Sequence, residues 1–202
     1  MIDTSIKAAL MRVARFYDGR KVGDVGFLGF RRSSDLTKLV ACLFAMMGEG
    51  FLVPGSSSFL DMGCGDGRVN VLFSYLTRKS VGVELDEWTL EEYSGLRREL
   101  DTLLTEERLP PPPDNIFLFH GDTMDSAVQE KISREAGVSF DDFDLFYTYL
   151  TMQEEFGELI ARKAGKGALF MVYGLERILP RFDGLRLLAP PLEGILALYK
   201  KE

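Results

Sequence analysis

Two segments near the start of the chain carry apolar residues at helical spacing. In residues 2–17 these residues are separated by three or four positions, which predicts an amphipathic helix. In residues 35–47 they fall on one face, with Asp35 as a candidate N-cap and Gly48 as a stop signal, so a second helix that covers a sheet is expected. The glycine-rich stretch between them, residues 23–30, is expected to form a loop. Residues 1–50 are therefore interpreted as an N-terminal helical cap.

From residue 56 onward, short apolar runs alternate with helical patterns. Helical spacing follows residue 67 and recurs in residues 87–104 and 153–163. The apolar runs between these segments are typical of buried strands and cover residues 58–62, 80–84, 115–119, 143–147 and 168–173. Such alternation indicates βαβ units, whose strands run parallel. The prolines at 110–113 are interpreted as a stiff connector, with a polyproline ligand for another protein as the alternative.

The pattern changes near the end of the sequence. Residues 185–188 and 195–199 are strand-like runs separated by a short segment with proline and glycine, which allows only an antiparallel hairpin. Together with the alternating part, this predicts an α/β fold with a doubly wound, mostly parallel seven-stranded sheet, an antiparallel last strand and helices on both faces. We assign the core to residues 56–202. The whole chain, 1–202, is expected to form a single domain, since domains usually span roughly 100–200 residues.

The composition is that of an ordinary globular protein. The chain of 202 residues is 46% hydrophobic and 27% charged, which argues against disorder and against a membrane protein. Its longest apolar run, residues 39–47, is far shorter than the ~20 residues that cross a bilayer. Residues 1–10 lack the basic start and cleavage site of a signal peptide, so a cytoplasmic location is expected.

Charge and metal-binding residue types exclude several functions. The net charge of -7 provides no general field for nucleic acid, so no nucleic-acid partner is expected, although a local basic strip is compatible with this charge. Cys42 and Cys64 are the only cysteines and His120 is the only histidine. A four-ligand zinc site of cysteine and histidine therefore cannot form, and we expect neither a metal site nor a disulfide framework.

The strongest motif is a glycine-rich turn, Asp61-Met-Gly63-Cys-Gly65-Asp-Gly67, between a predicted strand and a predicted helix. Its glycines let the backbone turn sharply and approach a ligand closely. The spacing is GxGxG, whereas the dinucleotide-binding fingerprint is GxGxxG. The carboxylate of Asp61 is badly placed for a pyrophosphate and well placed for an ammonium group.

A second acidic residue, Glu84, closes the next predicted strand. It lies near the ~20-residue offset from Asp61 at which an acid binds a ribose diol in Rossmann-type sites. A solvated surface acid is the alternative, but the offset after a glycine turn favours ribose binding. Nearby, Trp88 is a weaker candidate, which either forms a wall of a base-binding pocket or packs against the helix that follows it.

These two motifs resemble those of class I S-adenosylmethionine-dependent methyltransferases, whose first motif is an acidic residue, a spacer and GxGxG. The resemblance implies S-adenosylmethionine as the cofactor, with Asp61 on its amino group and Glu84 on its ribose. It also implies that an acid at the end of the third strand, Asp122, accepts a hydrogen bond from the adenine amino group. The remaining residues assigned to the cofactor site are neighbours of these acids or members of the glycine turn: Gly63, Cys64, Gly65, Gly67, Leu85 and Thr123. Cys64 is expected to pack beside the turn. His120 is expected to pack or to form a hydrogen bond at the strand end, in preference to a role as a general base.

The same family places the residues that face the transferred methyl group just after the fourth strand, which implies catalytic roles for Tyr147, Thr148 and Tyr149. Alternating aromatic residues at a strand end are as often part of a core. The segment lacks the Asn/Asp-Pro-Pro-Tyr/Phe pattern of methyltransferases that modify amino groups of nucleobases or glutamine. The first two motifs are most similar to small protein-lysine methyltransferases and their bacterial relatives, although residues 29–34 replace a Tyr/Val-Pro-Ser/Thr segment of that group.

The resemblance implies transfer of a methyl group to a protein amine or to a small molecule. Two alternatives remain open at this point. A binding module with a methyltransferase fold would keep the cofactor pocket and modify nothing. A nicotinamide-dependent oxidoreductase is disfavoured by the glycine spacing and by a chain too short for a separate substrate domain.

Overall fold

The sheet has the strand order β3-β2-β1-β4-β5-β7-β6. The computed structural model describes residues 2–20, 33–150, 152–175, 179–188 and 190–202. β1 to β5 are parallel, whereas β7 is antiparallel to both β5 and β6. This confirms the predicted mostly parallel seven-stranded sheet and its final hairpin. The strands are β1 (Ser58–Met62), β2 (Lys79–Glu84), β3 (Ile116–His120), β4 (Leu145–Tyr149), β5 (Leu169–Tyr173), β6 (Leu185–Leu187) and β7 (Leu196–Lys201).

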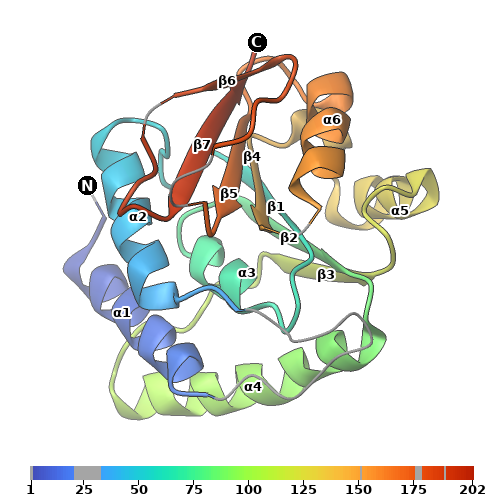
Figure 1. Cartoon of the computed structure of the whole chain (residues 1–202). Helices are drawn as coiled ribbons and strands as arrows, with labels where there is room; N and C mark the ends of the chain where they lie inside the picture. The colour runs from blue at the N-terminus through green and yellow to red at the C-terminus, as the bar shows by residue number, and fades with distance from the viewer. Residues whose placement is uncertain (1, 21–32, 151, 176–178, 189) are drawn as a thin grey trace.

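Helices cover both faces of the sheet, as predicted (Figure 1). Apolar side chains of the first four helices form one buried cluster with the sheet, and those of the last two form another. Within the described residues, no helix is both long and apolar enough to span a bilayer. The helices are α1 (Thr4–Asp18), α2 (Leu36–Gly48), α3 (Arg68–Ser74), α4 (Glu87–Glu106), α5 (Ser126–Ala136) and α6 (Gln153–Lys163).

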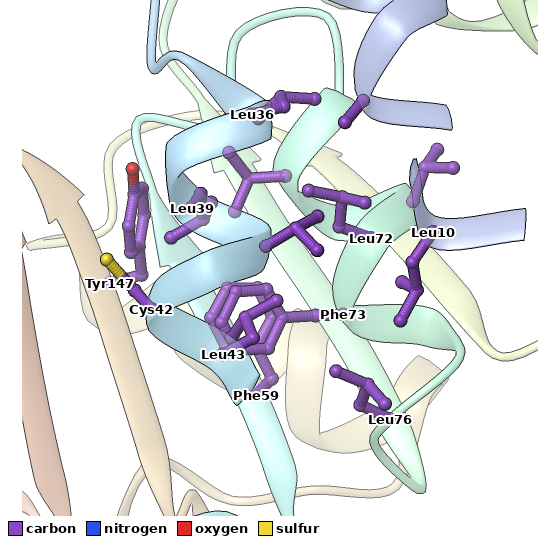
Figure 2. Close-up of a cluster of buried hydrophobic side chains, with 14 of the residues drawn as sticks. Leu10, Leu36, Leu39, Cys42, Leu43, Phe59, Leu72, Phe73, Leu76 and Tyr147 are labelled. Atoms are coloured by element: carbon purple, nitrogen blue, oxygen red, sulfur yellow. The ribbon is translucent and has the colours of Figure 1, made fainter. Parts of the chain in front are cut away.

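The N-terminal helices are built as their sequence predicts. The side chain of Asp35 caps α2 by accepting a hydrogen bond from Lys38 N over 2.9 Å, and Asp18 accepts from Leu36 N and Thr37 N at the same helix end. Figure 2 shows the apolar face of α2 packed over aromatic side chains of the sheet and of α3. The predicted loop at 23–30 lies outside the described residues.

Helix α5 was not predicted from the sequence. Only Ile132 and Ala136 of this helix are buried, so its apolar face is too narrow to give a clear helical pattern. Its N-cap, Asp125, accepts a hydrogen bond from Ala127 N over 2.9 Å, and Gly137 ends it in the left-handed conformation.

The fourth strand lies two residues later than predicted. The apolar run 143–147 includes Phe143, which is buried after a short 3-10 helix, Phe140–Asp142, and not in the strand. Asp144 fixes the start of β4, because its carboxylate accepts a hydrogen bond from Ser58 N over 2.7 Å. The strand therefore extends to Tyr149, which places this residue at the carboxyl end of the sheet.

Candidate functional site

The glycine turn between β1 and α3 has a left-handed backbone at each of its glycines, with φ values of 92° at Gly63, 58° at Gly65 and 75° at Gly67. Gly63 N and Cys64 N both donate to Val83 O over 2.9 Å, which ties the turn to β2. Apart from its two chain neighbours, no atom of the described residues would lie within 4 Å of a β-carbon at Gly63, so within this part of the structure the space beside the residue is open. The turn is thus rigidly held and leaves room for a ligand at its first glycine.

Asp61 is buried at the end of β1, immediately before this turn. It is only 1% exposed, and its Oδ1 atom accepts no hydrogen bond from the described residues. Burial and the nearby charges of Glu84 and Asp66 raise the pKa of Asp61 well above its ordinary value. A buried carboxyl oxygen without a donor is costly in free energy. Its chemistry fits a cationic N–H donor supplied by a ligand.

Glu84 lies beside the turn at the end of β2. One carboxylate oxygen accepts from Gly65 N over 2.8 Å and the other from Asp86 N over 2.9 Å. These bonds fix the orientation of the carboxylate and leave further lone pairs on each oxygen. Asp86 is the N-cap residue of α4 and accepts a hydrogen bond from the Thr89 hydroxyl. Glu84 therefore both braces the turn and remains able to accept from a pair of ligand hydroxyls.

Cys64 packs beneath the turn. It is 4% exposed, and burial raises the pKa of its thiol well above the ordinary value, so the thiol stays protonated. A β-carbon at Gly82 of β2 would lie 2.8 Å from Cys64 Sγ and 2.6 Å from Asn70 Oδ1. Only glycine at this strand position leaves space for both side chains.

A buried ion pair connects the turn to the N-terminal helix α1. Arg68 Nη2 donates to Asp66 Oδ2 over 2.6 Å and Arg68 Nε donates to Asp66 Oδ1 over 2.9 Å. The guanidinium carbon of Arg68 lies 5.4 Å from the ring centroid of Tyr17, which is fully buried. Sequence reasoning missed this link, because no local pattern relates residue 17 to residue 68.

The outer side of the site, beyond Glu84, exposes apolar surface. Leu85 is 57% exposed and Trp88 is 81% exposed, so Trp88 does not pack against its own helix. Glu84 pairs with His120 across β2 and β3, and a ring nitrogen of His120 lies 3.2 Å from Leu85 O. Leu85 and Trp88 thus offer uncovered apolar surface next to the candidate ribose-binding acid.

The predicted adenine-binding residues follow β3. Asp122 is exposed, and one of its oxygens accepts a hydrogen bond from Met124 N over 2.8 Å. Thr123 is buried, and its carbonyl accepts from Gln129 Nε2 over 2.8 Å. Because β1, β2 and β3 are adjacent and parallel, these residues lie at the same edge of the sheet as Asp61 and Glu84.

The structure separates the three candidates at the end of β4. Tyr147 is 2% exposed and lies beside α2 (Figure 2). Its hydroxyl shares a hydrogen bond of 2.5 Å with the Ser34 hydroxyl, and burial raises the pKa of Tyr147 well above its ordinary value. Thr148 is also 2% exposed and donates to Met62 O over 3.1 Å. Tyr149 is half-buried, with its ring centroid 5.7 Å from that of Tyr173. Of the three, Tyr149 has the most accessible side chain.

The segment 29–34, expected near the entrance of the methyl site, is described only at its end. Residues 29–32 lie outside the described part of the chain, whereas Ser33 and Ser34 lie inside it. Asp35 N donates to the Tyr173 hydroxyl over 3.0 Å, next to the bond between Ser34 and Tyr147. These contacts fasten the start of α2 to β4 and β5. Among the described residues, no group of three or more His, Cys, Asp or Glu side chains is arranged to hold a metal ion.

Comparison with protein-family models and with curated protein sequences finds no match. Solved structures, in contrast, share the fold. A putative methyltransferase, yhhF, from Escherichia coli has a TM-score of 0.52 at 15% identity, covering 88% of this chain and 91% of that one. An RNA methyltransferase from Salinibacter ruber, in complex with S-adenosyl-L-homocysteine, has a TM-score of 0.50 at 16% identity, covering 85% and 92%. The tRNA (m1A58) methyltransferase TrmI from Aquifex aeolicus has a TM-score of 0.50 at 15% identity, covering 83% and 54%.

These similarities define the class of fold. The chain shares the Rossmann-like fold of these methyltransferases, and in this chain a glycine turn follows β1 and an acidic residue ends β2. At such low identity the likeness concerns the fold alone. What the site binds must therefore be argued from its own residues.

Proposed function

We propose that this protein is an S-adenosylmethionine-dependent methyltransferase. The observation that carries the proposal is Asp61 Oδ1, a buried carboxyl oxygen without a hydrogen-bond donor in the described residues, directly before a turn whose first glycine borders open space. An amino-acid ammonium group supplies the missing N–H donor and positive charge. The resemblance of the sequence motifs to methyltransferases supports the same conclusion.

The other cofactor roles are proposed from the resemblance of the motifs, and the positions of the residues are compatible with them. Glu84 would accept hydrogen bonds from the ribose hydroxyls, and Leu85 would pack against the adenine ring. Asp122 would accept from the adenine amino group, with Thr123 beside it. Gly63, Gly65 and Gly67 would allow close backbone approach, and Cys64 would support the turn from below.

When bound, the cofactor supplies a methyl group already activated by a sulfonium. The protein needs chiefly to orient the acceptor and exclude water, so a site without an obvious general base is compatible with transfer. We assign Tyr149 to contact with the acceptor, because its side chain is the most accessible of the three candidates. Tyr147 and Thr148, whose hydroxyls bond to Ser34 and Met62, would position the end of β4.

For the acceptor, we favour a protein amine or a small molecule over a nucleic acid. The first two motifs are most similar to protein-lysine methyltransferases, and the net charge of -7 gives no general attraction for phosphates. The RNA and tRNA methyltransferases with this fold make nucleic acid the competing acceptor class. An amine acceptor must be neutral to react. Its nitrogen lone pair forms the new N–C bond while the S–C bond breaks and that electron pair stays on sulfur.

Calorimetry with S-adenosylhomocysteine and with NAD tests the cofactor. We expect micromolar binding of S-adenosylhomocysteine and no binding of NAD. Tight NAD binding without heat from S-adenosylhomocysteine would refute the proposal.

Label transfer tests the acceptor. Tritium from labelled S-adenosylmethionine should enter lysate material that protease degrades, or material of low molecular weight. Label in large molecules that survives protease and disappears with nuclease would rule out our acceptor assignment. Cofactor binding without transfer into any fraction would instead support a binding module that modifies nothing.

A further inference from the structure

Thr89 is a buried residue in the first turn of α4, and its hydroxyl contacts the N-cap residue of that helix. It is 5% exposed and lies three positions after Asp86, the N-cap. The Thr89 hydroxyl donates a hydrogen bond to the Asp86 carboxylate. An aspartate at this position usually accepts from a backbone N–H of the helix. The Asp86 side chain makes no such cap bond, so its carboxylate is bound through the Thr89 side chain instead.

The methyl group of Thr89 lies beside the glycine turn. A β-carbon built at Gly65 would lie 3.8 Å from Thr89 Cγ2, which places this methyl next to the middle glycine. Glycine adopts many conformations easily, so contacts from neighbouring side chains are needed to hold the turn in one shape. Threonine is β-branched and its χ1 angle is restricted, which fixes the methyl and the hydroxyl together. One side chain thus contacts both the turn and the start of α4.

Both contacts of Thr89 lead to Glu84, the candidate ribose-binding acid. Gly65 N donates to one oxygen of Glu84 over 2.8 Å, and Asp86 N donates to the other over 2.9 Å. Thr89 contacts the same two donors, Gly65 with its methyl and Asp86 with its hydroxyl. The contacts therefore close into a ring that joins the end of β2, the glycine turn and the first turn of α4.

We propose that Thr89 is a positioning residue for cofactor binding, which acts by holding the two backbone N–H groups that orient the Glu84 carboxylate toward the ribose hydroxyls. This inference rests on the proposed function, because it concerns the same cofactor site. A glutamate side chain rotates about several bonds, so fixing its carboxylate before the ligand arrives lowers the entropy cost of binding. Without the Thr89 hydroxyl, Asp86 and its N–H are less firmly placed, and the orientation of Glu84 is less well defined.

Thr89→Val removes the hydroxyl and keeps a β-branched side chain of nearly the same shape. Calorimetry with S-adenosylhomocysteine should show affinity about five- to tenfold below that of the wild type, because Glu84 is no longer fixed before binding. Thr89→Ser keeps the hydroxyl and should bind within about threefold of the wild type, since one methyl contact is lost. Thr102→Val is the matched control on the same helix. Its hydroxyl donates to Arg98 O over 3.0 Å on the exposed side, so the affinity should stay within about twofold.

A second ligand separates this role from a purely structural one. The analogue of S-adenosylhomocysteine that lacks the ribose 2′-hydroxyl cannot form one of the hydrogen bonds assigned to Glu84. The wild type should therefore bind S-adenosylhomocysteine at least about tenfold more tightly than the analogue. In Thr89→Val this ratio should fall to about threefold, because the hydroxyl meets a carboxylate that is no longer held in place. A threonine that only stabilised α4 would lower both affinities equally and leave the ratio unchanged.

Asp86→Ala removes the other end of the same hydrogen bond and should lower the ratio in the same way, so the test does not depend on one variant remaining folded. Two results would overturn the inference: a ratio in Thr89→Val or Asp86→Ala that equals the wild-type value, or an affinity of Thr89→Val that equals that of Thr102→Val. A wild-type protein that binds neither ligand would overturn the proposed function itself and this inference with it, and that result is separate from the other two.

Discussion

The buried and half-buried carboxylates of the candidate site differ in the hydrogen-bond donors and positive charges that surround them. Asp66 is paired with Arg68 through two short hydrogen bonds, and Glu84 accepts two backbone N–H groups. Asp61 lies among these charges, almost fully buried, with one oxygen that has no donor in the described residues. The protein thus keeps an unfavourable group where a cationic ligand would stabilise it, a common conflict between stability and function.

Asp61→Asn should increase the stability of the ligand-free protein and weaken cofactor binding. The unfolded chain ionises this carboxyl near 3.8, whereas the folded protein retains the proton to a higher pH. Between these two pKa values the folded state binds more protons than the unfolded state, so the wild-type protein loses stability as the pH rises. Asparagine cannot ionise, so the stability of the Asp61→Asn variant does not fall with pH for this reason. Thermal melts at about pH 4 and about pH 7 should therefore show an advantage of the variant that grows with pH.

Calorimetry on the same variant should show S-adenosylhomocysteine binding weakened by at least about tenfold, since a charge-assisted bond is lost. A variant that is less stable than the wild type at about pH 7 would show that Asp61 has a structural partner and is not reserved for a ligand.

Glu84→Ala should also weaken cofactor binding. Two charge-assisted hydrogen bonds to ribose are lost, each worth ~1.5–3 kcal/mol. Since Glu84 also holds Gly65 N and Asp86 N, Glu84→Gln is the necessary comparison, because it keeps one acceptor oxygen and should lose less affinity. Unchanged calorimetric affinity in Glu84→Ala, with circular dichroism showing an intact fold, would exclude the ribose role.

At the scale of secondary-structure elements, α1 takes part in shaping the glycine turn. Tyr17 of α1 lies under the guanidinium of Arg68, the first residue of α3, and this guanidinium holds Asp66 within the turn. The carboxylate of Asp18, the next residue of α1, accepts from the first backbone N–H groups of α2. The end of α1 thus connects the glycine turn with α2, the helix that covers the sheet.

Arg68→Met should destabilise the protein and weaken cofactor binding together, because it leaves the buried Asp66 carboxylate without its partner, at a cost of about 3–5 kcal/mol. The double variant Asp66→Asn with Arg68→Met removes the unpaired charge and should recover most of the stability. Arg134→Met is the matched control, since the pair between Arg134 and Glu135 is exposed and worth about 0–1 kcal/mol. Equal melting temperatures for Arg68→Met and Arg134→Met would contradict this account.

At the scale of the whole molecule, periodicity in the sequence was sufficient to predict the sheet and its final hairpin, because each strand is a short apolar run between turn residues. Periodicity failed where a buried apolar residue lies outside the strand next to it, and where a helix buries only a narrow face. Phe143 belongs to the core but not to β4, and α5 buries too narrow a face to be recognised. The glycine turn was predictable because its chemistry is local in sequence.

The rest of the site depends on contacts between distant segments. The stacking of Arg68 on Tyr17 and the hydrogen bond between Ser34 and Tyr147 join residues far apart in the chain. The burial of Tyr147 and of the Gln153 Oε1 atom, which has no hydrogen-bond partner among the described residues, follows from packing of the complete fold. A sequence pattern names candidate residues, but it does not say which of their polar atoms are already satisfied.

Cofactor binding should stabilise the whole molecule and be visible at its single tryptophan. At about 100 times its dissociation constant, a ligand specific for the folded state adds about 2.7 kcal/mol, which corresponds to roughly 5–10 °C in melting temperature. Trp88 is the only tryptophan and is 81% exposed next to the candidate ribose-binding acid, so adenosine bound there should shift its fluorescence to shorter wavelength as water is displaced.

Trp88→Phe should lose this fluorescence change and keep most of the thermal shift, which separates the reporter from binding itself. NAD at the same concentration should produce neither effect, because the GxGxG turn and the buried Asp61 are unsuited to a pyrophosphate. A thermal shift with NAD but not with S-adenosylhomocysteine would show that the open space beside Gly63 receives a dinucleotide, and would reverse the assignment of the site.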